Sequence, residues 1–186
     1  MDPVVTRILG LSGSLRRHSF NSGLLRAAAQ AMPAQAVLEI GSIAEIPLYN
    51  GDVEAEGIPQ AVAALKEKVV EADALLLVSP EYNNGIPGVF KNAIDWLSRP
   101  SSDIARVFGG KPVALIGASP GNFGTILSQA AWLPVFRTLG AEHWAGGRLL
   151  VSHAGQLFDA EGNLTDDAIR ERLRLYLRGF VAHLTR

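Results

Sequence analysis

The sequence has no cysteine among its 186 residues. This absence excludes disulfide bonds, thiolate catalysis and zinc sites built from cysteine. The sequence also has little net charge, formally −1 at pH 7, so no strong field is expected to attract nucleic acid or an anionic membrane. The same near-neutral balance provides no acidic face through which a one-electron carrier would dock. These absences favour small-molecule partners.

Long uninterrupted apolar runs are absent as well. Residues 112–136 contain no charged side chain, but Pro120 and the turn-forming residues after it divide the run into pieces too short to span a bilayer. Residues 1–4 show no basic leader followed by a long apolar segment, so no signal peptide is expected. The acidic residues of the connection 41–57 have no histidine nearby and predict a solvated loop, not a metal site. We therefore expect a soluble cytoplasmic protein without membrane insertion.

The sequence does contain an alternation of strand-like and helix-like segments. Its length and its hydrophobic content of 48% predict a single α/β domain over residues 1–186. The predicted strands are 4–9, 36–40, 74–78, 112–117 and 148–151. The predicted helices are 23–32, 58–72, 87–98, a segment from about 125 that Pro134 kinks or divides, and 166–184. This alternation predicts a parallel sheet that binds its ligand at the carboxyl ends of the strands.

A serine-rich stretch, residues 10–22, lies between the first predicted strand and the first predicted helix. Its backbone amides and the helix N-terminus would converge and form an anion site. The stretch matches neither the nucleoside-triphosphate loop nor the dinucleotide fingerprint, so we predict a terminal monophosphate. The candidate donors are Ser12, Ser14, Arg16, Ser19, Asn21 and Ser22. The alternative is an ordinary turn that caps the helix through Asn21 or Ser22.

Two further loops follow predicted strands at the same edge of the sheet. Residues 79–85 place backbone hydrogen-bonding groups and a flat side chain beside a buried strand, through Pro80, Glu81, Tyr82 and Asn83. Such a loop suits a planar heterocycle, although a helix cap with a surface tyrosine would have the same residues. Residues 119–125 offer flexible backbone that a ligand can approach closely.

Three motifs in these loops resemble the signature of the NADPH-dependent FMN reductase family. They are Gly-Ser-Leu-Arg-x-x-Ser-x-Asn at 13–21, Pro-Glu-Tyr-Asn-x-x-x-Pro-Gly-x-x-Lys-Asn-x-x-Asp-Trp at 80–96, and Gly-Ala-Ser-x-Gly-x-x-Gly at 117–124. Thr125 departs from the pattern, because many relatives have another small residue there. The resemblance implies a flavodoxin-like three-layer fold, with helices on both faces of a five-stranded parallel sheet in the order 2-1-3-4-5.

The resemblance also implies FMN as the cofactor. The ribityl phosphate would lie among Ser12, Ser14, Arg16, Ser19, Asn21 and Ser22. The isoalloxazine would lie along Pro80, Glu81, Tyr82 and Asn83, and Ser119 and Gly121 would help to close the site. Within this scheme no side chain is predicted to be catalytic, because the flavin carries the chemistry. His18 is expected at the surface.

The activity implied by the resemblance is a two-step hydride transfer. NADPH would deliver a hydride to flavin N5 and leave, and a small acceptor (a quinone, chromate, an azo compound or free flavin) would then occupy the same face. The preference for NADPH over NADH rests on the resemblance, since no clamp for an adenosine phosphate is evident. Two other classes stay open: a flavodoxin-type electron carrier and a non-catalytic flavin-binding module.

The segment around residues 126–136 predicts contact with a second subunit. It is apolar on nearly every side, whereas a helix that lies on a sheet needs only one apolar stripe. The resemblance likewise implies a homodimer or homotetramer, whose partner subunit often borders the flavin.

Overall fold

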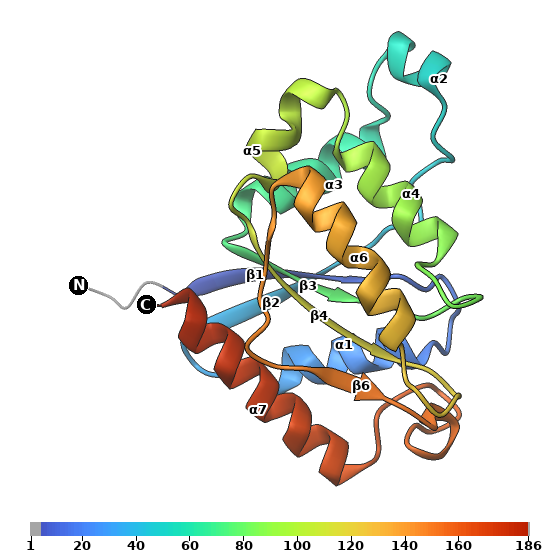
Figure 1. The fold of residues 1–186 in the computed structure, drawn as a ribbon, viewed down its shortest axis with the longest axis vertical. Helices are drawn as coiled ribbons and strands as arrows, with labels where there is room; N and C mark the ends of the chain where they lie inside the picture. Colours follow the sequence, from blue (N-terminus) through green and yellow to red (C-terminus); the bar gives the residue numbers. More distant parts are fainter. Residues whose placement is uncertain (1–4, 186) are drawn as a thin grey trace.

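The computed structural model describes residues 5–185. They form three layers, in which helices cover both faces of a six-stranded parallel sheet (Figure 1). The strand order is β2-β1-β3-β4-β5, and β6 also pairs with β4. The predicted flavodoxin-like fold and its strand order are therefore confirmed, with one strand more than predicted.

The elements follow one another in a β-α alternation. The strands are β1 (Thr6–Ser12), β2 (Ala36–Gly41), β3 (Ala74–Val78), β4 (Pro112–Ala118), β5 (Glu142–His143) and β6 (Leu149–Val151). The α-helices are α1 (Phe20–Gln30), α2 (Gly51–Glu56), α3 (Gln60–Glu71), α4 (Gly88–Leu97), α5 (Ile104–Phe108), α6 (Ile126–Leu139) and α7 (Asp167–Leu184). Two 3₁₀ turns, η1 (Ser101–Asp103) and η2 (Ala154–Gln156), complete the set. The sequence pattern did not predict α2, α5 or the 3₁₀ turns.

Strand β3 carries buried apolar side chains on both faces, which pack into two separate cores. Leu76 and Val78 belong to the core under α1 and α7, whereas Leu75 and Leu77 belong to the core under α3, α4, α5 and α6. An unbroken apolar strand is typical of a sheet that is covered on both faces. Figure 1 shows the same division of the helices between the two faces.

Strand β1 is longer than the sequence pattern predicted. The prediction ended it at Leu9, but β1 continues to Ser12 because β2 and β3 pair with it on both sides. Gly10 interrupts the apolar run for a packing reason, since a Cβ there would lie 2.5 Å from Leu25 Cδ1 of α1. The loop after β1 therefore begins at Gly13, not at Gly10. Residues 1–4, which include the predicted start of the strand and the segment judged for a leader, lie outside the described residues.

Helix α1 begins at Phe20, three residues before the predicted start. Its N-cap is Ser19, whose Oγ accepts hydrogen bonds from the backbone amides of Asn21 (3.2 Å) and Ser22 (3.3 Å). The expectation of a cap at Asn21 or Ser22 was therefore wrong by two or three positions. A serine cap satisfies two of the amides that the first turn of a helix leaves without an intrahelical acceptor.

Strand β4 meets two short strands on its outer side. β5 pairs with Pro112 and Val113, and β6 pairs with residues 116–118. Neither strand pairs with Leu115, which lies between these two stretches. The Tyr176 hydroxyl of α7 fills the gap: it accepts a hydrogen bond from Leu115 N (3.1 Å) and donates one to Leu115 O (3.0 Å). Burial raises the pKa of the Tyr176 phenol. A strand of two residues such as β5 is too short to leave a periodic signal, which is why only β6 was predicted.

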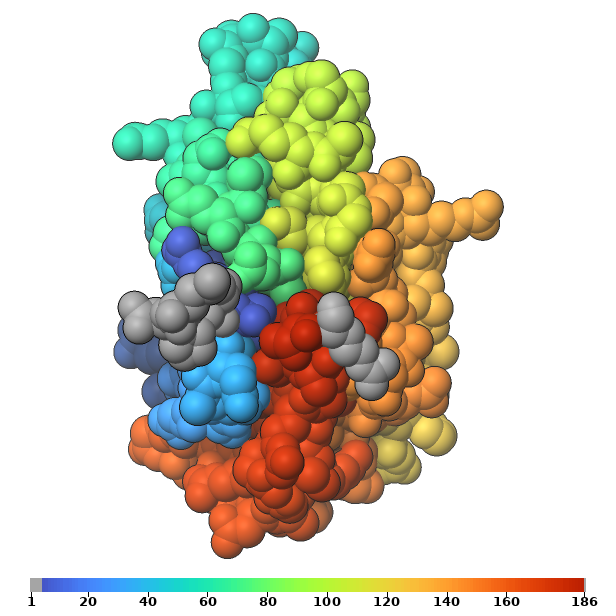
Figure 2. Space-filling view, turned by 90° about the vertical axis from the view of Figure 1, so that its left-hand side faces the viewer, coloured from blue at the N-terminus to red at the C-terminus, as the bar shows by residue number. Residues whose placement is uncertain are grey.

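Helix α6 and the long connection after β2 also differ from expectation. Pro134 does not divide α6. A proline has no N–H, so it leaves the carbonyl of Ala130 without an intrahelical hydrogen bond. Ala130 and Pro134 are both exposed, so water can bond to this carbonyl. The connection 41–57 contains α2, which Asn50 caps through a hydrogen bond from Asp52 N (2.9 Å). α2 stands away from the sheet at one end of the molecule (Figures 1 and 2).

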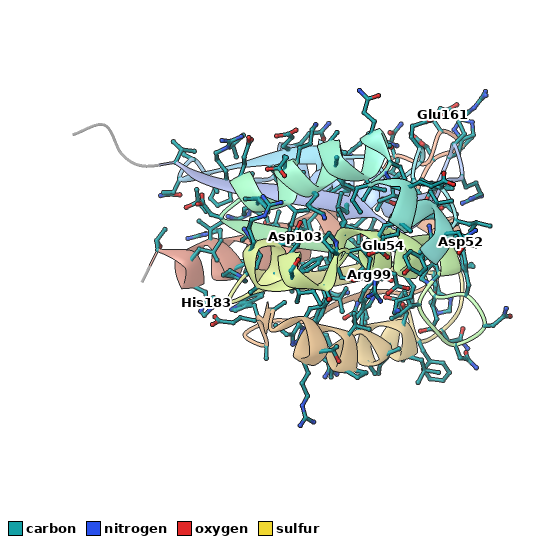
Figure 3. All side chains as sticks on the ribbon, turned by 90° about the horizontal axis from the view of Figure 1, so that it is seen from above. Asp52, Glu54, Arg99, Asp103, Glu161 and His183 are labelled. Carbon is teal, nitrogen blue, oxygen red and sulfur yellow. The ribbon has the colours of Figure 1, made fainter. Side chains whose placement is uncertain are left out.

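Residues 5–185 contain neither a membrane-spanning helix nor a cluster of metal ligands. No helix in this part of the chain is long and apolar enough to cross a membrane. Within the same residues, no group of three or more His, Asp or Glu side chains is placed to hold a metal ion. The acidic residues Asp52 and Glu54 stand on α2 (Figure 3), where the Glu54 carboxylate accepts a hydrogen bond from the Tyr49 hydroxyl at 2.7 Å.

Candidate cofactor site

A cleft of about 310 Å³ lies at the carboxyl edge of the sheet, where β1, β3 and β4 end. Loops after these strands supply its lining: Ser14, Arg16, Ser19, Phe20, Asn21, Pro80, Glu81, Tyr82, Ala118, Ser119 and Pro120. The sequence analysis had singled out all of these except Phe20, Ala118 and Pro120. Four other predicted residues do not line the cleft: Ser12, Ser22, Asn83 and Gly121. The structure therefore brings most of the predicted residues to one place.

The loop after β1 leaves several hydrogen-bond donors available to a ligand. The backbone amides of Leu15, Arg17, His18 and Phe20 have no acceptor within the described residues 5–185. They lie on both sides of the Ser19 cap, at the start of α1. The first turn of α1 contains no acidic residue, so its positive end is not neutralised locally. An anion at this point would meet donors from the loop and from the helix together.

Arg16 is the cation among the residues that line the cleft, and Glu81 is the acid. The Arg16 guanidinium lies 5.1 Å from the centroid of the Phe20 ring, in a cation–π contact that holds the side chain over the start of α1. Arg16 is exposed and forms no ion pair with the described residues 5–185. Its side chain can therefore turn toward a ligand. Phe20 has no polar side-chain group, so the sequence analysis did not predict it in the cleft. It lines the cleft because α1 begins at this residue.

Asn21 supports the cleft through the end of β4. Its side-chain amide donates to Ala118 O (2.8 Å) and accepts from Ala118 N (2.9 Å), so it joins the start of α1 to the end of β4. Asn21 is 4% exposed, and this pair of hydrogen bonds uses its carbonyl and one N–H. The sequence analysis had assigned it as a phosphate donor, whereas the structure shows a side chain that joins two walls of the cleft.

Ser12 and Ser22 lie beneath the loop and outside the lining. Their hydroxyl oxygens are 3.0 Å apart in a mutual hydrogen bond that connects the end of β1 to the first turn of α1. The amide of Ser14 lies 3.4 Å from Ser12 Oγ, and the amide of Arg16 lies 3.3 Å from Ser14 Oγ. These hydroxyls shape the loop, and Ser14 and Ser19 are the two that also reach the cleft.

The loop after β3 forms the second wall and contains a tight turn. Tyr82 and Gly85 exchange backbone hydrogen bonds of 3.2 and 3.1 Å around Asn83 and Asn84, whose φ angles are 49° and 62°. Positive φ at both central residues is typical of a type I′ turn, which asparagine tolerates better than most residues. The turn carries Tyr82, 49% exposed, to the cleft, where its hydroxyl lies 3.5 Å from Ser14 Oγ. Asn83 therefore shapes the turn and does not line the cleft.

Glu81 of the same loop contacts the start of α6. Its Oε2 accepts hydrogen bonds from the backbone amides of Leu127 (2.8 Å) and Ser128 (2.9 Å). Deeper in the structure, the Ser79 hydroxyl bonds to Ser128 Oγ (2.9 Å) and accepts from Trp132 Nε1 (2.9 Å). All three of these deeper side chains are completely buried. The end of β3 and helix α6 therefore form one hydrogen-bonded unit behind the second wall.

The loop after β4 forms the third wall and is closed by its own hydrogen bonds. The Ser119 hydroxyl donates to Gly124 O (2.5 Å), and the carbonyls of Ser119 and Gly121 accept from the amides of Ala154 (3.0 Å) and His153 (3.1 Å). Ser119 thus lines the cleft with its side chain already engaged, while Gly121 lies outside the lining.

His18 lies at the surface, as expected. Its ring Nδ1 is 3.3 Å from the carbonyl of Glu161, and the residue is exposed. No histidine or carboxylate pairs with a serine of the cleft within the described residues, so nucleophilic catalysis by Ser14 or Ser19 has no structural support. The cleft has the donors of a binding site for an anionic group.

A family comparison agrees with this geometry. The family described as NADPH-dependent FMN reductase matches residues 6–156, a segment that contains all three loops of the cleft. The chain belongs to the NADPH-dependent FMN reductase family.

Curated relatives within this FMN reductase family are similar over most of their lengths. An NAD(P)H-dependent FMN reductase of Pseudomonas aeruginosa is 43% identical over 172 residues, which cover 92% of this chain and 91% of the relative. A 2-hydroxy-1,4-benzoquinone reductase of a Burkholderia species is 36% identical, with 95% and 94% covered. Among solved structures, the flavoenzyme FerB of Paracoccus denitrificans, an NAD(P)H:acceptor oxidoreductase, has a TM-score of 0.86 and 31% identity over 97% of this chain and 98% of FerB.

The donor set of the cleft fits the cofactor in the family's name. A ribityl monophosphate needs several hydrogen-bond donors and a positive charge. The donors here are the unengaged amides at the start of α1, and the positive charge is that of Arg16. The acid of the cleft, Glu81, has its carboxylate turned to the amides of α6, which removes the obvious source of repulsion. A flavin ring would find backbone groups and the flat side chain of Tyr82 along the second wall.

Proposed function

We propose that the protein is an FMN-dependent oxidoreductase that passes a hydride from NADPH or NADH to a small acceptor, such as a quinone. One observation carries this proposal: the matched family segment folds into a cleft at the N-terminus of α1, whose first turn contains no acidic residue. The relatives' names support the donor and the acceptor class, because they include an NAD(P)H-dependent FMN reductase and a benzoquinone reductase.

Each wall of the cleft has a role in this proposal. Ser14, Arg16, Ser19 and the free amides around them hold the phosphate, while Asn21, Ser12 and Ser22 keep that loop in place. Pro80, Glu81 and Tyr82 border the flavin ring, and Asn83 sets the turn that presents Tyr82. Ser119 and Gly121 shape the loop that closes the far side.

When bound, FMN would supply hydride transfer: it would accept a hydride from NAD(P)H and pass two electrons and a proton to the acceptor, which would take a second proton from water. The chain's own contribution is binding and orientation. Tyr82 is 49% exposed, so the cleft is open to solvent on this side. The nicotinamide and the acceptor can then use this opening in turn.

An anaerobic titration tests the proposal. Apoprotein is loaded with FMN, titrated with NADPH and separately with NADH, and followed at the visible flavin band. We expect the band to bleach with about one equivalent of nucleotide and to recover when a benzoquinone is added. A protein that binds FMN without bleaching would be a carrier or a binding module, and a protein that binds no FMN would refute the assignment altogether.

We also propose that the protein is a homodimer or homotetramer that associates through α6. The outer face of α6 exposes apolar side chains, with Leu127 and Leu133 each 47% exposed, and a groove of about 410 Å³ runs beside it. The variant L133E should shift light scattering toward the mass of a monomer. L175E, on the outer face of α7, is the matched control and should leave the mass unchanged. A monomeric parent at micromolar concentration would contradict the proposal.

We further propose that residues 1–186 act as one FMN-binding domain, since Ile8 of β1 and Val181 of α7 share one core. The proposed place of action is the cytoplasm, where nicotinamide nucleotides are reduced. Cell fractionation tests the location, and a single cooperative unfolding transition of the apoprotein tests the domain count.

A further inference from the structure

Glu81 is the acid among the residues that line the cleft, and its side chain contacts a different element, helix α6. One carboxylate oxygen accepts two backbone amides of the first turn of α6, at 2.8 and 2.9 Å. Hydrogen bonds from amides to a carboxylate are among the stronger ones in proteins. The loop after β3 is therefore attached to the start of α6.

Helix α6 has no cap of its own. Its N-cap residue, Thr125, makes no side-chain cap hydrogen bond, and its first turn contains no acidic residue. The negative charge at this helix end comes from Glu81, which precedes Leu127 by 46 residues in the chain. A carboxylate at a helix N-terminus satisfies orphan amides and offsets the positive end of the helix dipole.

A second, deeper contact fixes the geometry of this attachment. Ser79, directly before the cleft residues, hydrogen-bonds to Ser128 and Trp132 of α6, and all three are fully buried. Pro80, between the two contacts, lines the cleft. With α6 bonded at Ser79 and again at Glu81, the backbone between them has little freedom to rotate.

We propose that Glu81 is a positioning residue for the flavin reaction, which rests on the function proposed above. It acts through α6 in two ways. It holds the backbone of residues 80–82 at the cleft, and its charge offsets the positive end of α6 next to this loop. Reduced FMN carries more negative charge than oxidised FMN, so this offset weakens the binding of the reduced form relative to the oxidised form.

The variants E81Q and E81A separate the two effects. The amide oxygen of E81Q still accepts hydrogen bonds but carries no charge, whereas E81A removes both. In E81Q we expect the affinity for oxidised FMN to stay within about threefold of the parent. Its preference for reduced over oxidised FMN should rise about three- to tenfold, a factor consistent with one charge at a helix terminus. In E81A we expect the affinity for oxidised FMN to fall about tenfold, because the loop is no longer held.

The measurements are FMN titrations of the apoprotein and the midpoint potential of the bound flavin, neither of which depends on turnover. The matched control is E142Q, which removes an exposed carboxylate at the start of β5. Glu142 pairs with Pro112 where β4 begins, whereas the cleft lies where β4 ends. E142Q should change neither quantity. An E81Q potential equal to that of the parent, or a loss of FMN in E81Q as large as in E81A, would overturn the proposal.

Amide hydrogen exchange of the apoprotein keeps the test independent of the proposed function. The amides of Leu127 and Ser128 should be protected in the parent and in E81Q, and should exchange at least about tenfold faster in E81A. If the parent binds no FMN but shows this pattern, the attachment stands while the proposed function fails. Equal exchange in the parent and E81A would overturn the attachment itself.

Discussion

Helices α1 and α6 both begin at the carboxyl edge of the sheet, but their N-termini are treated in opposite ways. α1 is capped by the neutral hydroxyl of Ser19, has no acidic residue in its first turn, and lies beside the cation Arg16. α6 has no cap of its own and receives the carboxylate of Glu81 from another loop. One helix end is left positive and the other is neutralised.

The difference shows how two helix ends at the same edge of a sheet can be made unequal for an anion. An open N-terminus carries about half a positive charge and attracts phosphate groups. Two open ends at the same edge of the sheet would offer a phosphate two competing positions. Because Glu81 neutralises the α6 end, the α1 end is the more favourable of the two for an anion.

The strongest test makes the α1 end resemble the α6 end. In S19D the cap is as good as serine, so the apoprotein should unfold at the same temperature or slightly higher. A carboxylate about 4 Å from a phosphate charge costs roughly 4 kcal/mol at an effective dielectric constant of about 20. The affinity for FMN, measured by quenching of its fluorescence, should therefore fall at least about 100-fold. S19N is the neutral control and should retain most of the affinity; equal affinity in S19D would mean that the phosphate lies elsewhere.

Removing the nearby cation should have the second largest effect. A hydrogen bond to a charged group contributes on the order of 1.5–3 kcal/mol, so R16A should retain FMN about ten- to a hundredfold less tightly. Purified R16A should be paler per mole than the parent. R17A changes the neighbouring exposed arginine, which does not line the cleft, and should keep the parent's colour. Equal flavin content in R16A and the parent would remove Arg16 from the phosphate site.

Removing the α1 cap without adding charge should cost stability more than binding. S19A leaves the amides of Asn21 and Ser22 without their acceptor, which typically costs about 1 kcal/mol. Urea unfolding of the apoprotein measures this loss. S101A, in the exposed turn η1, is the control and should unfold as the parent does. If S19A were as stable as the parent, the cap would contribute nothing that water does not replace.

The smallest effect is expected at a third helix end. α7 is capped by its own Asp166, whose Oδ1 accepts from Ile169 N at 2.8 Å, and Asp167 follows in the first turn. D166N keeps the cap and removes one of two charges, so the free energy of unfolding should fall by only about 0.3–0.5 kcal/mol. Its FMN affinity should equal that of the parent, and a larger change would show that α7 is coupled to the cleft.

The sequence predicted the sheet and the edge that carries the cleft because both depend on local patterns. Short apolar runs marked four strands and β6, and the loops after β1, β3 and β4 carried enough polar residues to single out their shared edge. The sequence also singled out Ser14, Arg16 and Tyr82, and all three line the cleft.

The remaining features depend on contacts between distant segments. Asn21 reads as a ligand donor in sequence, but the end of β4, 97 residues away, takes up its side-chain amide. Glu81 was likewise predicted to line the ligand. Only the folded chain shows that α6 lacks a cap of its own and that the Glu81 carboxylate takes its place. The sequence shows which polar groups a chain has, whereas the packing of its helices decides which of them remain free.

The Tyr176 hydroxyl has a consequence for how the molecule behaves among copies of itself. Beside β4, the sheet edge consists of two short fragments, β5 and β6, with a phenol oxygen between them occupying the amide and carbonyl of Leu115. A continuous row of open backbone groups is what lets a foreign strand add to a sheet and begin aggregation. Here that row is broken from within, so this side of the sheet offers an incoming strand no template of useful length.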